Sequence, residues 1–212
     1  MEAVIFDMDG VIFDSERIVY EGWKELSEKY GFKDLDIVYR KCIGVNIATC
    51  KQIYLDFYGE DFPYDKYREE RAADYQAKYS GGRLPMKPGV EEILAYLKER
   101  GFLIAIASST SHALVEQQIK DAGLIKYFDV IVGGDQVAKS KPAPDIFIKA
   151  AELLGIRPES AYVIEDSYNG IRAAKTAGMR PIMVPDMVEA DDEMREKAWR
   201  ICSSLENVIE VI

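Results

Sequence analysis

From residue 90 onward, the sequence alternates between helical and strand-like patterns, and this alternation limits the chain to few folds. Apolar runs predict strands at residues 102–107, 129–132, 161–164 and 181–184. The segments between them have helical spacing, and glycines close three of these helices. Because strands joined through helices favour right-handed crossovers, we predict an α/β fold with a Rossmann-like, doubly wound parallel sheet.

The first strand of this sheet is separated from the others by a long helical stretch. Residues 3–6 form a short apolar run that reads as a buried strand. Residues 16–81 are rich in charges, have helical spacing and contain no convincing strand, so we expect about four helices there. We therefore predict a core of residues 1–15 plus 82–212 and an inserted α-helical cap domain of residues 16–81.

Composition and charge narrow the function classes. The chain has 212 residues, 48% of them hydrophobic, which is enough for a buried core. Its net charge of −10 disfavours nucleic acid and anionic membrane surfaces as partners. Three cysteines without a C-x-x-C pattern argue against a disulfide framework or a zinc site and favour the cytoplasm. No signal peptide or membrane span is expected, and we expect a monomer or weak homo-oligomer.

Polar side chains follow four of the predicted strands at the point where each strand ends. They are Asp7 and Asp9 after the first strand, Ser108, Ser109 and Thr110 after the second, Lys141 in the loop after the third, and Glu165 and Asp166 after the fourth. Ligands of parallel α/β sheets bind beyond the carboxyl ends of the strands. We therefore expect all of these residues to face one cleft.

The four carboxylates of this set predict a metal site. Asp7, Asp9, Glu165 and Asp166 would repel one another unless a cation shared the site. Carboxylate and carbonyl oxygens suit a hard dication, and the single histidine cannot build a nitrogen-rich site, so we predict Mg²⁺.

The same residues favour phosphoryl transfer. A carboxylate such as Asp7 is an adequate nucleophile toward phosphorus, where alignment and charge neutralisation matter most. Asp9 could protonate the leaving group and later accept a proton from water. Ser108, Ser109 and Lys141 would then bind the phosphoryl oxygens. Read singly, Asp7 and Asp9 could form a solvated turn, Lys141 could be a surface lysine, and Glu165 and Asp166 could cap a helix.

Four motifs together resemble those of the haloacid dehalogenase superfamily, in its phosphatase and β-phosphoglucomutase branch. They are Asp7-Met8-Asp9-Gly10-Val11, Ser108, Lys141-Pro142-Ala143-Pro144-Asp145, and Glu165-Asp166-Ser167 with Gly170. The resemblance implies a Rossmann-like core, a helical cap after the first motif, Mg²⁺, and phosphoryl transfer through an aspartyl-phosphate on Asp7. We therefore predict a phosphatase that hydrolyses a small phosphate monoester, such as a sugar phosphate.

Two alternatives stay open. In the mutases of this branch the cap carries a histidine and an arginine, and Val19 and Ile47 stand at the matching positions here, which favours hydrolysis over a β-phosphoglucomutase-like reaction. Phosphonatase relatives use a cap lysine, and neither Lys24 nor Lys29 can be assigned to that role. A non-catalytic sensor of phosphorylated ligands is the other alternative, although no motif residue is lost.

The cap is expected to contribute substrate specificity. The predicted loop Gly44, Val45 and Asn46 could reach the active site, and Arg71 on the last cap helix could touch the substrate, although a solvated arginine is the simpler interpretation. Closure of the cap would exclude water, with hinges at residues 13–16 and 80–82.

Overall fold

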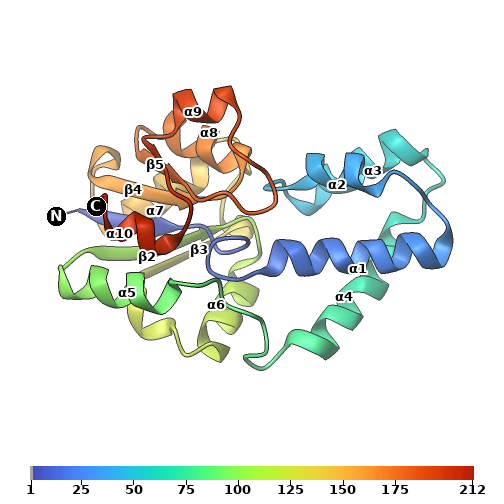
Figure 1. Ribbon diagram of the computed structural model, residues 1–212, viewed down its shortest axis with the longest axis horizontal. Coiled ribbons are helices and arrows are strands. Elements are labelled where there is room, and N and C mark those ends of the chain that lie inside the picture. Colours follow the sequence, from blue (N-terminus) through green and yellow to red (C-terminus); the bar gives the residue numbers. More distant parts are fainter. Residues whose placement is uncertain (1) are drawn as a thin grey trace.

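A six-stranded parallel sheet forms the centre of the protein in a computed structural model that describes residues 2–212 (Figure 1). The strands follow the order β3-β2-β1-β4-β5-β6, and every neighbouring pair is parallel. Their bounds are β1 Ala3–Phe6, β2 Leu103–Ser108, β3 Val130–Gly133, β4 Ala161–Glu165, β5 Arg180–Met183 and β6 Arg200–Ile201. The chain reverses its direction of travel across the sheet beside β1, which is where such folds bind ligands.

Helices cover both faces of the sheet because successive strand side chains point to opposite sides. Val4 and Phe6 pack with α5, α6 and α10 on one face, whereas Ile5 packs with α7 and α8 on the other. The helices of this part are α5 Val90–Glu99, α6 His112–Asp121, α7 Asp145–Leu154, α8 Tyr168–Thr176, α9 Asp192–Lys197 and α10 Leu205–Ile209, with short 3₁₀ helices η1 Ile125–Tyr127, η2 Gly134–Gln136 and η3 Pro158–Ser160.

Four helices between β1 and α5 project from the carboxyl edge of the sheet (Figure 1). They are α1 Ser15–Tyr30, α2 Leu35–Cys42, α3 Ile47–Tyr58 and α4 Tyr64–Tyr79. Their apolar faces enclose a separate cluster in which Trp23 lies 4.7 Å from Tyr54 and 5.5 Å from Tyr64, measured between ring centroids. The helical layer therefore has a core of its own.

The observed fold confirms the predicted α/β class. Every strand predicted from the sequence lies within one residue of its observed bounds, and the helix at residues 145–154 coincides with α7. The elements α9, β6 and α10 are too short to leave a periodic pattern and are not predicted. The helix α1 begins at Ser15, one residue before the predicted start of the cap. The division into a core of residues 1–15 plus 82–212 and a cap of residues 16–81 remains a proposal. Within residues 2–212, no helix combines the length and the apolar character needed to cross a bilayer.

Candidate active site

A buried ion-pair network joins three strand ends. The Lys141 Nζ lies 2.6 Å from Asp7 Oδ1 and 2.7 Å from Glu165 Oε1. All three side chains are almost fully buried, so water screens these charges little. The network fixes the loop after β3 against the ends of β1 and β4, and it brings together residues that the sequence predicted to meet.

Two glycines make this packing possible. Gly10 has φ of +80°, and a Cβ atom there would lie 2.4 Å from Asp166 Oδ2. A Cβ at Gly170, in the first turn of α8, would lie 1.7 Å from Glu165 Oε1. Any larger side chain would therefore displace one of the two carboxylates, which explains why glycine stands at both places.

Asp7, Glu165 and Asp166 can together hold a cation. One carboxylate oxygen from each lies within 4.8 Å of the others, and all three residues are buried. The Oδ2 of Asp166 is buried and has no hydrogen-bond partner among the described residues. An unpartnered buried carboxylate oxygen is costly unless a cation or donor approaches it, so these oxygens fit a hard dication such as Mg²⁺.

Glu165 is already engaged by protein donors. Its Oε1 accepts from Lys141, and its Oε2 accepts from the backbone N–H of Ser167 at 2.7 Å and the Ser167 hydroxyl at 2.9 Å. The Ser167 hydroxyl also accepts from the N–H of Gly170, so it caps α8. Glu165 is thus held rigidly by protein donors. Asp166, by contrast, has a carboxylate oxygen without a donor among residues 2–212, and this oxygen is free to bind a metal.

Burial changes the protonation of the cluster. Burial raises the pKa of Asp7 to about 7, because Glu165 and Asp9 add to the desolvation and Lys141 offsets only part of it. Burial and the neighbouring Glu165 and Asp7 also raise the pKa of Asp166 well above its usual value. Burial alone would lower the pKa of Lys141, but Asp7 and Glu165 raise it, and the net direction is upward. Lys141 is therefore a permanent cation, whereas the aspartates need further positive charge to ionise fully.

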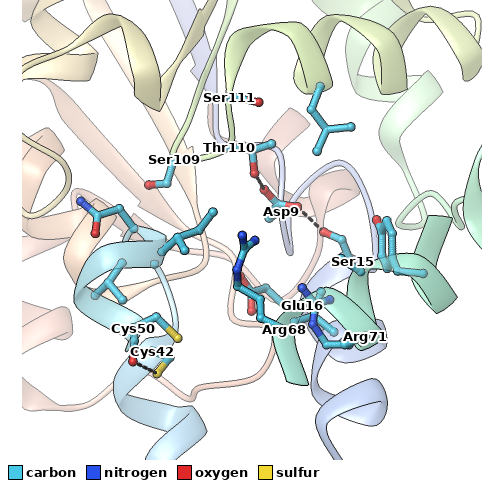
Figure 2. Close-up of a pocket in the computed structure, with 18 of the residues that line it drawn as sticks. Asp9, Ser15, Glu16, Cys42, Cys50, Arg68, Arg71, Ser109, Thr110 and Ser111 are labelled. Atoms are coloured by element: carbon cyan, nitrogen blue, oxygen red, sulfur yellow. Dashed lines mark hydrogen bonds between the residues drawn. The ribbon is translucent and has the colours of Figure 1, made fainter. Parts of the chain in front are cut away.

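The Asp9 carboxylate lies among hydroxyl groups, between Ser15 and Thr110 (Figure 2). Its Oδ1 accepts from the Ser15 hydroxyl at 2.6 Å, and its Oδ2 accepts from Thr110 at 2.9 Å and from Ser108 at 3.3 Å. Its carboxylate is therefore not among the three that could share a cation. The hydroxyls fix its direction instead, which suits a group that exchanges protons with a substrate.

A cavity of about 380 Å³ lies between the sheet edge and the four helices (Figure 2). Its wall contains Asp7, Asp9, Ser109 and Lys141 from the strand ends and the predicted cap residues Gly44, Val45, Asn46 and Arg71. Ser108 is fully buried beneath this wall, where its hydroxyl accepts from the N–H of Thr110. A cavity of this volume falls within the range of metabolite sites.

The helical layer contacts the strand-end loops directly. The Asn46 side chain caps α3 by accepting from the Thr49 N–H at 2.8 Å, and its Nδ2 donates to the Ser140 hydroxyl at 3.0 Å. A Cβ at Gly44 would lie 2.5 Å from the Ser167 hydroxyl. The predicted loop thus touches the segments that carry Lys141 and Glu165.

Several residues in the cavity wall are not predicted from the sequence. Ser15 and Glu16 belong to this group, as do Tyr39 and Arg68, whereas Thr110 is expected at the cleft with Ser108 and Ser109. Burial raises the pKa of Glu16 to about 8, with Asp9 adding to the shift, while the Tyr39 hydroxyl donates to Glu16 Oε2 at 3.0 Å. Glu16 follows the first motif closely, which could have marked it, whereas the inward faces of α2 and α4 carry no such signal.

Of the other positions considered from the sequence, Val19 and Ile47 both line the cavity. Lys24 and Lys29 lie outside its wall, and Lys29 pairs with Glu70 at 2.6 Å. The two apolar residues are therefore in contact with the space a substrate would fill, and the two lysines are not.

Comparisons with known proteins agree with this geometry. The model of the haloacid dehalogenase-like hydrolase family matches residues 4–184. A phosphorylated carbohydrates phosphatase from Thermotoga maritima is 35% identical over 182 residues, covering 86% of this chain and 84% of the relative. The β-phosphoglucomutase of Bacillus subtilis is 32% identical, covering 84% of this chain and 81% of the relative. The crystal structure of CbbY from Rhodobacter sphaeroides in complex with phosphate is 28% identical and superposes with a TM-score of 0.78, covering 98% of this chain and 96% of that one. This chain is therefore an enzyme of the haloacid dehalogenase-like hydrolase family.

Proposed function

We propose that this enzyme is a Mg²⁺-dependent phosphatase that hydrolyses a small phosphate monoester through an aspartyl-phosphate on Asp7. One observation carries the proposal. Asp7 lies in the cavity wall beside the cation of Lys141 and within 4.8 Å of the Asp166 and Glu165 carboxylates, while Asp9 lines the same cavity. The proposed nucleophile and the proposed proton carrier thus line one cavity, and the other carboxylates proposed for the metal site lie within 4.8 Å of the nucleophile.

The proposed reaction has two steps. Asp7 attacks phosphorus, a bond forms between its carboxylate oxygen and phosphorus, the ester P–O bond breaks, and Asp9 gives a proton to the leaving alkoxide. Water then attacks the phosphorus of the aspartyl-phosphate, Asp9 takes a proton from it, and inorganic phosphate leaves as the Asp7 carboxylate is restored. The hydroxyls of Ser15, Thr110 and Ser108 hold the Asp9 carboxylate in one orientation in the cavity wall.

Charge neutralisation in this site would come from both protein and metal. Asp7 and Asp166 are the residues proposed to hold Mg²⁺, which would neutralise phosphoryl charge in the transition state. Lys141 and Ser109 would bind phosphoryl oxygens, while Glu165 keeps Lys141 in place. The predicted part of Asp9 in metal binding would not use its carboxylate, which the hydroxyls occupy.

The proposed substrate is a phosphorylated sugar or a similar small metabolite. The Thermotoga relative is named a phosphorylated carbohydrates phosphatase, and a cavity of about 380 Å³ suits a compound of that size. The enzyme is proposed to be cytoplasmic and to be a monomer or a weak homo-oligomer. Its three cysteines are free thiols, which suits the cytoplasm.

A phosphomutase is the second candidate, because relatives named β-phosphoglucomutase match most of the chain. The apolar side chains of Val19 and Ile47 in the cavity wall favour hydrolysis instead, since neither can replace the histidine and the arginine that the mutases carry at these positions. Conversion of a sugar 1-phosphate to its 6-phosphate with a bisphosphate primer would identify the mutase, and we expect no conversion.

Release of inorganic phosphate from a panel of esters with Mg²⁺ tests the proposal. We expect release by the native enzyme, near-complete loss in Asp7→Asn, and retention in the exposed-loop control Asp61→Asn. Equal release by Asp7→Asn would overturn the assigned nucleophile. Binding of esters without any release would instead support the non-catalytic sensor.

A further inference from the structure

Two arginines of α4 enter the cavity without a partner. Arg68 and Arg71 both line its wall, one turn apart on the same helix face. Figure 2 shows the Arg68 guanidinium reaching toward Asp9, whereas Arg71 lies closer to Glu16. Within residues 2–212, neither guanidinium forms an ion pair or a side-chain hydrogen bond.

The position of Arg71 is built into the packing of α1 against α4. A Cβ at Gly22 of α1 would lie 2.9 Å from Arg71 Cγ, so the glycine makes room for the arginine stem. The Nε of Arg71 is buried and has no hydrogen-bond partner in the described chain. An unsatisfied buried donor on a cation is costly, which indicates that a group outside the protein completes it.

The other charges of the cavity do not neutralise this pair. Asp7 and Glu165 are bonded to Lys141, and neither carboxylate pairs with an arginine of α4. Glu16 shares the cavity wall but forms no ion pair with either arginine, and it is bonded to Tyr39 instead. The α4 side of the cavity therefore presents two guanidinium groups that have no ion-pair partner among the described residues.

We propose that Arg68 and Arg71 form a subsite for a second anionic group of the substrate, distinct from the phosphoryl group that Asp7 accepts. Guanidinium groups bind carboxylates and phosphates through paired hydrogen bonds, so either group satisfies the subsite. The preferred substrate is then a small metabolite with a phosphate ester at one end and a carboxylate or second phosphate at the other. This inference rests on the proposed function, because it takes the cavity as the substrate site.

Matched ligands test the subsite. Isothermal titration of the Asp7→Asn enzyme with Mg²⁺ compares glycerol 3-phosphate with 3-phosphoglycerate, and fructose 6-phosphate with fructose 1,6-bisphosphate. The first pair probes a carboxylate and the second a phosphate. We expect tighter binding of the doubly anionic ligand in at least one pair, by about 10- to 100-fold. The pair that shows this preference identifies the anion.

Variants on the same helix assign the preference. In the Asp7→Asn background, Arg68→Gln and Arg71→Gln should each reduce the ratio of affinities about tenfold or more, and Arg68→Lys should retain part of it. Lys66→Gln removes a charge from an exposed position of α4 outside the cavity wall and should keep the ratio. Melting temperatures confirm that the compared proteins are folded.

Each outcome decides between the two proposals. Equal binding within both pairs, or a preference that survives both glutamine variants, overturns the subsite. Absence of hydrolysis by the native enzyme, with the arginine-dependent preference intact, overturns the phosphatase and leaves the subsite standing.

Discussion

Lys141 Nζ lies 2.6 Å from Asp7 Oδ1 across 134 positions of chain, inside the protein. The same ammonium lies 2.7 Å from Glu165 Oε1, so one cation serves two buried carboxylates. Removing one partner of a buried ion pair leaves the other charge uncompensated, and this cost greatly exceeds that of breaking a surface pair. Lys141 therefore supports both the fold and the proposed reaction.

Lys141→Ala is expected to destabilise the metal-free protein by about 3–5 kcal/mol. It should also lower kcat about 10²–10³-fold, since a positive group facing the phosphoryl oxygens is lost. Urea denaturation and phosphate release measure the two effects. Lys98→Ala is the control, because Lys98 pairs with Asp129 at 2.9 Å near the surface and should cost about 0–1 kcal/mol without changing kcat. Similar stability losses in both variants would refute the role of burial.

Gly170→Ala tests the close approach of α8 to Glu165. A methyl group there would overlap Glu165 Oε1 at 1.7 Å, so the carboxylate must move and release Lys141. We expect loss of at least about tenfold in kcat, corresponding to about 1.4 kcal/mol of transition-state stabilisation. Thr176→Ala, in the last turn of the same helix, should keep kcat near the native value. Native activity in Gly170→Ala would mean that the position of Glu165 does not matter.

The Asn46–Ser140 bond predicts how the helical layer closes on the sheet edge. Ser140→Ala removes only the 3.0 Å bond between the two, whereas Asn46→Ala also removes the cap of α3 and should cost about 1 kcal/mol more in unfolding free energy. We expect Ser140→Ala to raise KM with little change in stability. A double-mutant cycle on KM measures the coupling, and additive effects would show that the bond does not contribute to closure.

Glu16 predicts a pH-dependent stability. Burial and then Asp9 raise its pKa from 4.5 to about 8, so the folded state keeps its proton while the unfolded chain loses it. The folded state binds more protons between pH 4.5 and 8, and stability therefore falls as pH rises through this window. Glu16→Gln cannot ionise, so its stability relative to the native protein should increase from pH 5 to 8 and stay constant above.

Urea midpoints at half-unit pH steps measure this difference. The charged groups that act on Glu16 are Asp9, Asp7 and Asp186, together with the hydrogen-bonding Tyr39. Glu60→Gln, at an exposed loop position, serves as control and should show no such trend. A pH-independent difference for Glu16→Gln would contradict the raised pKa.

Metal removal should abolish turnover and lower stability. Because Asp166 Oδ2 has no partner among the described residues, a bound cation would satisfy it, and Mg²⁺ at a hundredfold excess over its Kd should add about 2.7 kcal/mol of stability. Melting temperatures with EDTA and with Mg²⁺ measure this gain. Asp166→Asn should lose most of the Mg²⁺ effect, whereas Asp61→Asn should keep it. An unchanged Mg²⁺ response in Asp166→Asn would move the metal site elsewhere.

Much of the core is predictable because its signals are local. The run Ala3–Phe6 and the helix Asp145–Leu154 carry their own hydrophobic pattern and boundaries, so their positions follow from the sequence. The convergence of Asp7, Lys141 and Glu165 also follows, since parallel strands end at a common edge. The two-residue strand Arg200–Ile201 has no such pattern and depends on pairing with β5.

The sequence by itself determined the parallel sheet, the inserted helices and the set of acids and lysine at the strand ends, because periodicity and strand order place these without knowledge of packing. Only the tertiary structure decided how each group is used. It directs Asp9 toward Ser15 and Thr110 rather than toward the other carboxylates. It also turns Arg68 into the cavity. Both results depend on how four helices pack against one another and over the sheet edge, and contacts between residues far apart in the chain leave no periodic trace in the sequence.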